Sequence, residues 1–360
     1  MEWHLTHFTP PFFNPFTHTE KAMLVLNNRL TQLITLLQRH SRVVALFGFL
    51  SGAASFFMVN RQNSSAGVIV VILLLSWLWL VFENVLTQQL TRHFSWQLPP
   101  LVLGFITKSI HQESLFFVLP FFAITTTWNS GQLFFTTLLG GAALVSIIDP
   151  IYNNQLVQRR WIYIAFHTFT LFAVMLTALP IIFHLTTSQS YQCAMCSAVV
   201  FASPSLFSRT KGQSVWVGAL QFLGMSTALI LLLWFGRHWV PPSTLWLTNV
   251  IITTENRNGE SISSEGISTL TLDLMRTKGI YAYTTIKAPR GLNERIYHLW
   301  RYNGREVDRI PLDISGGRKE GYRTWTHKMN FPENPLGKWQ IEVVTEAEQL
   351  IGVVRFQVTE

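Results

Sequence analysis

Ionisable residues in or beside apolar stretches are the part of this chain best suited to chemistry. Lys108, His111 and Glu113 lie close together, and Glu83 and Asp149 each end another apolar stretch. Ionisable groups inside a membrane segment are costly and suggest a functional site by default. Together these five side chains could form an intramembrane proton or ion site. We favour the alternative, a structural ion-pair network that ties helix ends together, and the sequence contains no His-Glu-x-x-His zinc motif.

Cys193 and Cys196, the only cysteines, form a Cys-x-x-Cys motif. In an oxidising compartment such a motif can form a disulfide or a redox pair. Membrane oxidants that relay electrons generally need a second cysteine pair, and this sequence has none. We therefore expect two small, buried, reduced thiols on a helix. The sequence predicts no catalytic residue, no metal ligand and no cofactor.

The C-terminal part of the chain is rich in aromatic residues, which can form a platform for sugars. His298, Trp300, Arg323 and Trp325 are the candidates for such a binding face. Tryptophan also builds the cores of β-sandwiches, and we favour that interpretation for the group as a whole. Trp339 is in phase with apolar neighbours and is predicted to lie in the core.

The elements that position these residues change character at Arg237. A hydrophobic block from Val43 to Phe235 ends there, and an ordinary mixed sequence follows. A helix needs roughly 20 apolar residues to cross a bilayer core of about 30 Å. We therefore expect seven membrane spans, with six or eight as alternatives: Val43–Val59, Ala66–Phe82, Thr107–Trp128, Leu133–Ile148, Trp161–Leu185, Cys193–Phe207 and Val215–Phe235.

One motif in the first span predicts close helix packing. Gly48-x-x-x-Gly52 places two glycines on the same helix face, where they let another helix approach. The partner could lie within the bundle or in another subunit.

Charge is divided in the same way as hydrophobicity. Residues 1–240 hold 12 Lys/Arg and 5 Asp/Glu, and residues 241–360 hold 15 and 14, so +7 of the net charge of +8 belongs to the first part. Excess Lys and Arg in membrane proteins lies in cytoplasmic loops, so nucleic acid is not needed as a partner. Most basic residues precede the first span or follow the second, fourth and sixth. This predicts a cytoplasmic N-terminus and a C-terminal part outside.

Residues 1–42 lack the basic and apolar regions of a signal peptide. Between Thr19 and His40, leucine and isoleucine recur at helical spacing, flanked by basic residues. This predicts an amphipathic helix on the inner membrane surface or, equally, a cytoplasmic helix packed on the bundle. The expected domains are this helix at 1–42, a transmembrane helical domain at 43–237, a linker at 238–246 and a periplasmic β-sandwich at 247–360.

The period of the apolar pattern changes to two from about Leu245 onward, as in half-buried strands. Turn sequences such as Asn303-Gly304 separate the runs. Eight short strands at this spacing indicate an all-β immunoglobulin-like sandwich. No segment of this part shows a convincing helical pattern, so no helix is expected in it.

Motifs in roughly the last hundred residues resemble the bacterial "domain of unknown function 2914". They are His298-x-Trp300, Gly304, Gly321-Tyr322-Arg323-Thr324-Trp325, Gly337-x-Trp339 and Phe356-x-Val358. The hydrophobic half also resembles proteins that carry this domain, through residues 111–120 and Asp149-Pro150-x-Tyr152. The resemblance implies a bacterial inner-membrane protein with a periplasmic sandwich, and it brings no known activity.

The leading hypothesis is therefore non-enzymatic. A multi-pass inner-membrane protein would contact the lipid bilayer and hold a periplasmic domain that binds another envelope protein or a glycan. The alternative is a transporter or membrane-embedded enzyme whose site uses Lys108, His111, Glu113 and Asp149.

Overall fold

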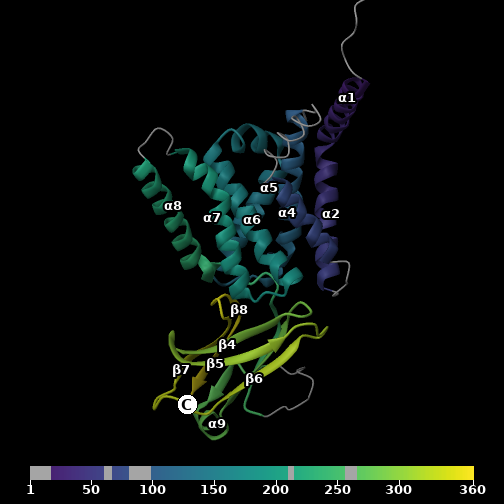
Figure 1. Ribbon diagram of the computed structural model, residues 1–360. Coiled ribbons are helices and arrows are strands. Elements are labelled where there is room, and N and C mark those ends of the chain that lie inside the picture. Colours follow the sequence, from purple (N-terminus) through teal and green to yellow (C-terminus); the bar gives the residue numbers. More distant parts are fainter. Residues whose placement is uncertain (1–17, 61–66, 81–98, 210–214, 256–265) are drawn as a thin grey trace, which may run out of the picture.

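The computed structural model describes residues 18–60, 67–80, 99–209, 215–255 and 266–360, which form a helical part and an all-β part (Figure 1). A helix lies at each of the positions predicted to span. The helical elements are α1 His18–Arg39, α2 Ser41–Asn60, Gly67–Leu80, α4 Pro100–Thr125, α5 Gln132–Ile147, η1 Ile151–Leu156, α6 Arg160–Phe183, α7 Thr187–Arg209, α8 Val215–Gly236 and η2 Arg237–Trp239.

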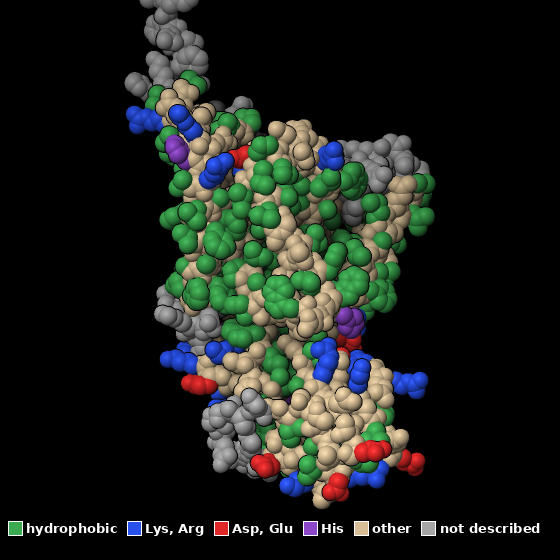
Figure 2. Space-filling model, turned by 180° about the vertical axis from the view of Figure 1, so that it is seen from behind, with side chains coloured by type: hydrophobic (Ala, Val, Ile, Leu, Met, Phe, Trp, Pro, Cys, Tyr) green, Lys and Arg blue, Asp and Glu red, His purple; other side chains and the backbone are tan. Residues whose placement is uncertain are grey.

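Within the described chain, three of these stretches are long and apolar enough to cross a membrane. They are Ser41–Met58, Arg160–Phe183 and Trp216–Trp239. Gly67–Leu80 and Gln132–Ile147 are apolar but shorter. Hydrophobic side chains cover the middle of the helical part, and Lys and Arg lie at the end that carries α1 and over the β domain (Figure 2). The helical part is compatible with membrane association.

The core of the helical part is built mainly from α4 and α6. Phe117, Phe122 and Phe172 are almost fully buried among aliphatic neighbours. The predicted close approach at Gly52 occurs within the bundle, because a Cβ atom there would lie 2.4 Å from the backbone oxygen of Phe116 on α4. Side chains larger than hydrogen cannot fit between α2 and α4 at this point.

Eight strands occur in the described residues of the C-terminal part. They are β1 Trp246–Thr253, β2 Thr269–Thr271, β3 Ile280–Lys287, β4 Asn293–Tyr302, β5 Arg305–Ser315, β6 Tyr322–Lys328, β7 Gly337–Thr345 and β8 Leu350–Thr359. They form a three-stranded sheet in the order β1-β3-β6 and a five-stranded sheet in the order β2-β8-β7-β4-β5. All pairs are antiparallel except β2 with β8.

The two sheets enclose a shared core. Trp300 and Trp339 from the five-stranded sheet pack in one buried cluster with Ile252 and Ile280 from the three-stranded sheet. Trp339 is 1 % exposed, which confirms its predicted place in the core. Its indole Nε1 donates a hydrogen bond to the Pro335 carbonyl oxygen at 2.8 Å.

One predicted strand is wrong over most of its length. Alternation of apolar residues from Ser268 to Met275 predicts one of the eight strands, but β2 ends at Thr271 and the helix α9, Leu272–Lys278, follows. Asp273 in the first turn and Lys278 in the last complement the helix dipole. Gly279, at a φ of 70°, then ends the helix in a conformation that favours glycine. The expectation of no helix in this part is therefore also wrong.

The expected linker packs tightly between the two parts of the protein. Residues 240–245 are all buried, and Leu245 is fully enclosed in a cluster with Ile286 and Val343 of the β domain. The Ser243 hydroxyl donates to the Leu176 carbonyl oxygen of α6 at 2.9 Å. We call residues 240–245 the docking segment, since they contact both parts.

Candidate functional site

The polar site in the helical part is assembled by α4, η1 and α6. Lys108 and His111 lie three residues apart on α4, so they share one face of the helix. Asp149 and Pro150 precede η1, which turns Tyr152 inward. These elements meet toward the end of the bundle that carries α1, opposite the β domain (Figure 1).

Lys108 and Asp149 form an ion pair across α4 and the start of η1. The lysine side chain is 12 % exposed and the aspartate side chain 32 %. The Lys108 ammonium also lies 5.9 Å from the centre of the Tyr152 ring, within the range of a cation–π contact. A cation this enclosed therefore has both an anion and an aromatic face beside it.

His111 is fully buried and bonds at both ring nitrogens. Its Nδ1 lies 2.8 Å from the Tyr152 hydroxyl, and its Nε2 lies 2.8 Å from Nδ1 of His167 on α6. All three groups are satisfied if Tyr152 donates to His111 and His111 donates to His167. Such a chain of hydrogen bonds can hold or pass a proton.

Aromatic residues surround this chain. The ring centre of Trp77 lies 5.6 Å from that of His111 and 5.0 Å from that of His167. The Trp77 indole donates to the Ser114 hydroxyl at 2.8 Å. Phe166 packs edge-to-face on His111. His167 was not among the predicted site residues, although an ionisable side chain within an apolar span is itself the signal that identifies it.

The five predicted ionisable residues do not form a single cluster. Lys108 and Asp149 are paired, and His111 lies one turn further along α4. Glu113 points elsewhere: a Cβ atom on Gly48 of α2 would lie 2.7 Å from its Oε1. Glu83 lies outside the described residues.

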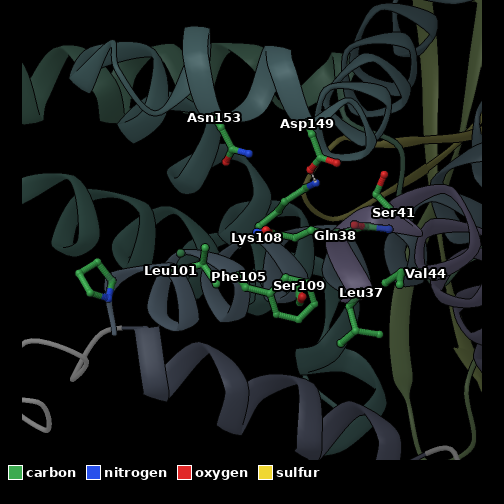
Figure 3. Close-up of a pocket in the computed structure, with 13 residues that line it drawn as sticks. Leu37, Gln38, Ser41, Val44, Leu101, Phe105, Lys108, Ser109, Asp149 and Asn153 are labelled. Atoms are coloured by element: carbon green, nitrogen blue, oxygen red, sulfur yellow. Dashed lines mark hydrogen bonds and ion pairs between the residues drawn. The ribbon is translucent and has the colours of Figure 1, made fainter. Parts of the chain in front are cut away.

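A cavity of about 250 Å³ opens beside the Lys108–Asp149 pair (Figure 3). It lies between α1, α2, α4 and η1, and we call it the charge-pair cavity. Gln38, Ser41 and Asn153 line it together with the ion pair. Gln112 also lines it, is 7 % exposed, and makes no hydrogen bond to any described residue.

A second polar cluster joins the β domain to the helix ends. The Glu294 carboxylate, 3 % exposed, accepts hydrogen bonds from the Thr187 backbone N–H at 2.7 Å and the Thr187 hydroxyl at 2.9 Å. Burial raises the pKa of Glu294 from 4.5 to about 7, although both bonds from Thr187 act in the opposite direction. Gln132 of α5 donates to the Leu350 carbonyl oxygen at 2.8 Å, and Gln349 donates to that of Val240 at 3.1 Å.

Two of the four predicted binding-face residues lie inside the β domain. Trp300 and His298 are fully buried because their parity on β4 directs them between the sheets. His298 bonds the hydroxyls of Thr284 at 3.1 Å and Thr326 at 2.9 Å, which ties the two sheets together. Burial lowers its pKa from 6.5 to about 4. The His-x-Trp motif is thus a core motif.

The other two predicted residues lie on the outer face of the three-stranded sheet. Trp325 is 44 % exposed, and Arg323 on the same strand is also exposed. Beside them Tyr281 stacks on His327, with 3.8 Å between ring centres and 5.8 Å from Tyr281 to Trp325. We call these four residues the aromatic face.

Cys193 and Cys196 are free thiols on α7, and both are exposed on the helix surface. The expectation that they are buried is therefore wrong. They lie one turn apart, and neither packs into the bundle. Among the described residues, no group of three or more His, Cys, Asp or Glu could hold a metal ion.

The fold and these sites define a class: a helical protein compatible with membrane association, with an all-β domain docked on its helix ends. Residues 23–282 match the model described as Family of unknown function (DUF5924), so the chain belongs to that family. Residues 293–358 match the model described as Protein of unknown function (DUF2914), which confirms the resemblance predicted from the motifs. No curated protein and no solved structure matches the chain.

The boundary between the two matches crosses the β domain. The first match ends at Ala282 within β3, and the second begins at Asn293, where β4 begins. Strand β1 and the first part of β3, Ile280–Ala282, therefore belong to the DUF5924 match, while their sheet partner β6 belongs to DUF2914. The two family segments together build one domain.

Proposed function

We propose that this protein is a seven-span bacterial inner-membrane protein that holds an immunoglobulin-like domain in the periplasm for binding. The arrangement of the chain supports an odd number of crossings. α1 lies at one end of the bundle, and α8 delivers the chain to the β domain at the other (Figure 1). Arg159 precedes α6 and Arg160 begins it, at the α1 end, as the positive-inside rule requires of a cytoplasmic face.

The two shorter helices are compatible with this proposal. With a rise of 1.5 Å per residue, α5 is about 24 Å long, and the described stretch Gly67–Leu80 is about 21 Å long. A span shorter than the hydrocarbon core of about 30 Å is accommodated by local thinning of the bilayer at modest cost.

Two packed, mainly antiparallel sheets with buried tryptophans support the immunoglobulin-like assignment.

The buried docking segment is the observation that carries the proposal. A domain on a free tether would leave its linker exposed, whereas residues 240–245 are enclosed by both parts of the protein. Glu294, Gln132 and Gln349 add hydrogen bonds across the same boundary. The β domain is therefore held in one orientation relative to the bilayer, which suits it to presenting a fixed surface.

The aromatic face is the surface we assign to binding. Trp325, Tyr281 and His327 offer ring faces, and Arg323 adds a cation with several hydrogen-bond donors. Exposed aromatic residues and arginine are typical of binding hot spots. The proposed partner is another envelope protein or a glycan strand.

Site-specific cross-linking in living cells tests this proposal. A photoactivatable residue at Arg323 should capture a discrete envelope partner, and Trp325→Ala should abolish the capture. The matched control is the same probe at Arg305, which is exposed on the other sheet. Equal capture from both positions, or none from Arg323 together with no glycan retained by the intact purified protein, would count against a binding role.

A second candidate function is transport or membrane-embedded catalysis in the helical part. The observation that favours it is the charge-pair cavity beside the Tyr152–His111–His167 chain. Under this alternative, Lys108→Met and Asp149→Asn would yield stable, correctly inserted, inactive proteins. A purely structural pair predicts instead that the single variants fold poorly or behave like the parent.

A further inference from the structure

The charge-pair cavity has a polar wall and an apolar wall. Lys108 and Asp149 lie on one side, and Leu37 and Leu101 on the other (Figure 3). Leu101 is 38 % exposed, so the apolar wall continues onto the outer surface of the helical part. A ligand that suits both walls carries a charged group and an apolar group.

Both charges of the pair have bonding capacity to spare. The Lys108 ammonium has three N–H donors, and Oδ1 of Asp149 is its one hydrogen-bond acceptor among the described residues. Asp149 keeps its second carboxylate oxygen, and its side chain is 32 % exposed. Gln112, a residue that is 7 % exposed, adds an amide that bonds no other described residue and can donate to a ligand in the cavity.

In the membrane-spanning arrangement proposed above, the depth of the cavity matches the level of lipid headgroups. α4 has 26 residues and a length of about 39 Å, which exceeds the hydrocarbon core of about 30 Å. Lys108 lies about 12 Å along the axis from Pro100, the first helical residue. The ion pair therefore lies near the boundary between headgroups and hydrocarbon.

We propose that the charge-pair cavity binds the headgroup of a zwitterionic aminophospholipid, of the phosphatidylethanolamine type. The phosphate of the lipid accepts hydrogen bonds from Lys108 and Gln112, and the primary ammonium of the lipid headgroup donates a hydrogen bond to Asp149. The acyl chains leave over Leu37 and Leu101. This inference rests on the membrane-spanning arrangement proposed above and adds a ligand to it.

Charge balance selects this class of lipid. The cavity contributes one cation and one anion, so a headgroup with one of each leaves no charge unpaired. An anionic phosphatidylglycerol headgroup has a phosphate for Lys108 but no cation for Asp149, so the carboxylate would be left unpaired. A phosphatidylcholine headgroup has no N–H donor for the carboxylate and is bulkier.

Native mass spectrometry of the full-length protein, delipidated in detergent, tests the proposal. Phosphatidylethanolamine, phosphatidylglycerol and phosphatidylcholine with identical acyl chains are added in turn. We expect phosphatidylethanolamine to bind tightest. Asp149→Asn and Gln112→Leu should each weaken its binding about tenfold, the effect of losing one hydrogen bond to a charged group.

Matched controls separate the site from general effects. Asp313→Asn, on an exposed pair of the β domain, and Gln192→Leu, exposed on α7, should bind as the parent does. If Asp149→Asn is not recovered in folded form, the binding of phosphatidylethanolamine by Gln112→Leu is compared with that by the parent instead. Soluble glycerophosphoethanolamine should compete only weakly, because it lacks the acyl chains.

Two results would overturn the inference. One is equal binding of the three lipids by the parent, unchanged in Asp149→Asn and Gln112→Leu. The other is competition by glycerophosphoethanolamine as effective as that by the lipid, which would make the ligand a soluble zwitterion. Neither result depends on which side of the membrane the β domain occupies, so failure here is distinct from failure of the proposed topology.

Discussion

Glu294→Gln should remove one specific pH dependence from the stability of this protein. Glu294 is buried between β4 and the start of α7, where Thr187 donates two hydrogen bonds to it. Its pKa is raised from 4.5 to about 7, mainly by burial. Glutamine keeps an acceptor for Thr187 and is neutral at every pH, so it isolates the ionisation from the contact.

The sign follows from the direction of the pKa change. A carboxyl whose pKa is raised on folding contributes stability that is fully present below its unfolded pKa and is lost as the pH rises through the folded value. The change from 4.5 to about 7 corresponds to about 3 kcal/mol, most of it between pH 5 and pH 8. Ionisation of Glu294 therefore weakens the contact between the β domain and α7 above neutral pH.

In acid, His298 makes the stability of the protein depend on pH in the opposite direction. Its pKa is lowered from 6.5 to about 4, so its contribution is present above pH 6.5 and is lost as the pH falls toward 4. In the parent the two effects oppose each other between about pH 4.5 and 6.5. Above pH 6.5, of these two groups only Glu294 still makes the stability change with pH.

Thermal unfolding of the full-length protein in detergent, followed from pH 5 to pH 8.5, provides the assay. Relative to Glu294→Gln, the parent should lose about 5 °C in Tm across this range, at about 2 °C per kcal/mol for a protein of this size. Glu320→Gln, at an exposed position, should keep the parent profile. Parallel profiles for the parent and Glu294→Gln would refute the assignment of a buried, pKa-shifted carboxyl at this boundary.

Three further predictions concern packing, charge and domain boundaries. Gly52→Ala should destabilise the protein by about 1–3 kcal/mol in thermal unfolding, because the new methyl group meets the backbone of Phe116. Gly48→Ala meets side chains instead, the movable end of Glu113 at 2.7 Å and the Phe116 ring at 3.3 Å, and should cost less. Lys108→Met should destabilise by about 1–3 kcal/mol by leaving Asp149 unpaired, and adding Asp149→Asn should restore much of the loss. A fragment limited to the DUF2914 match should stay unfolded by circular dichroism, since it lacks β1 and β3; a cooperative transition would contradict this.

The sequence was most informative where a periodic pattern was long. Apolar blocks predicted a helix at each expected span, and alternation predicted seven of the eight strands closely. The strand after Ser268 failed because alternation over a few residues also fits a short helix: Leu272 and Met275 lie three apart and share one helix face.

Contacts between distant segments were beyond sequence reasoning. Residues 240–245 have the composition of a loop, and only the three-dimensional structure shows that both parts enclose them. His298 and Trp300 were assigned to the correct strand, but a pattern in one strand does not tell the inner face from the outer. The pairing of His111 with His167 joins α4 to α6, and no local spacing encodes it.

Thiol labelling in intact cells is the most direct test of a β domain fixed on the non-cytoplasmic side. Cys193→Ala and Cys196→Ala remove the natural thiols, after which Glu320→Cys reports on the β domain and Arg39→Cys on α1, both at exposed positions. With the outer membrane permeabilised, a reagent that cannot cross the inner membrane should label Glu320→Cys at once and Arg39→Cys only after lysis. Labelling of Arg39→Cys before lysis, with Glu320→Cys protected, would contradict the topology on which the proposed function depends.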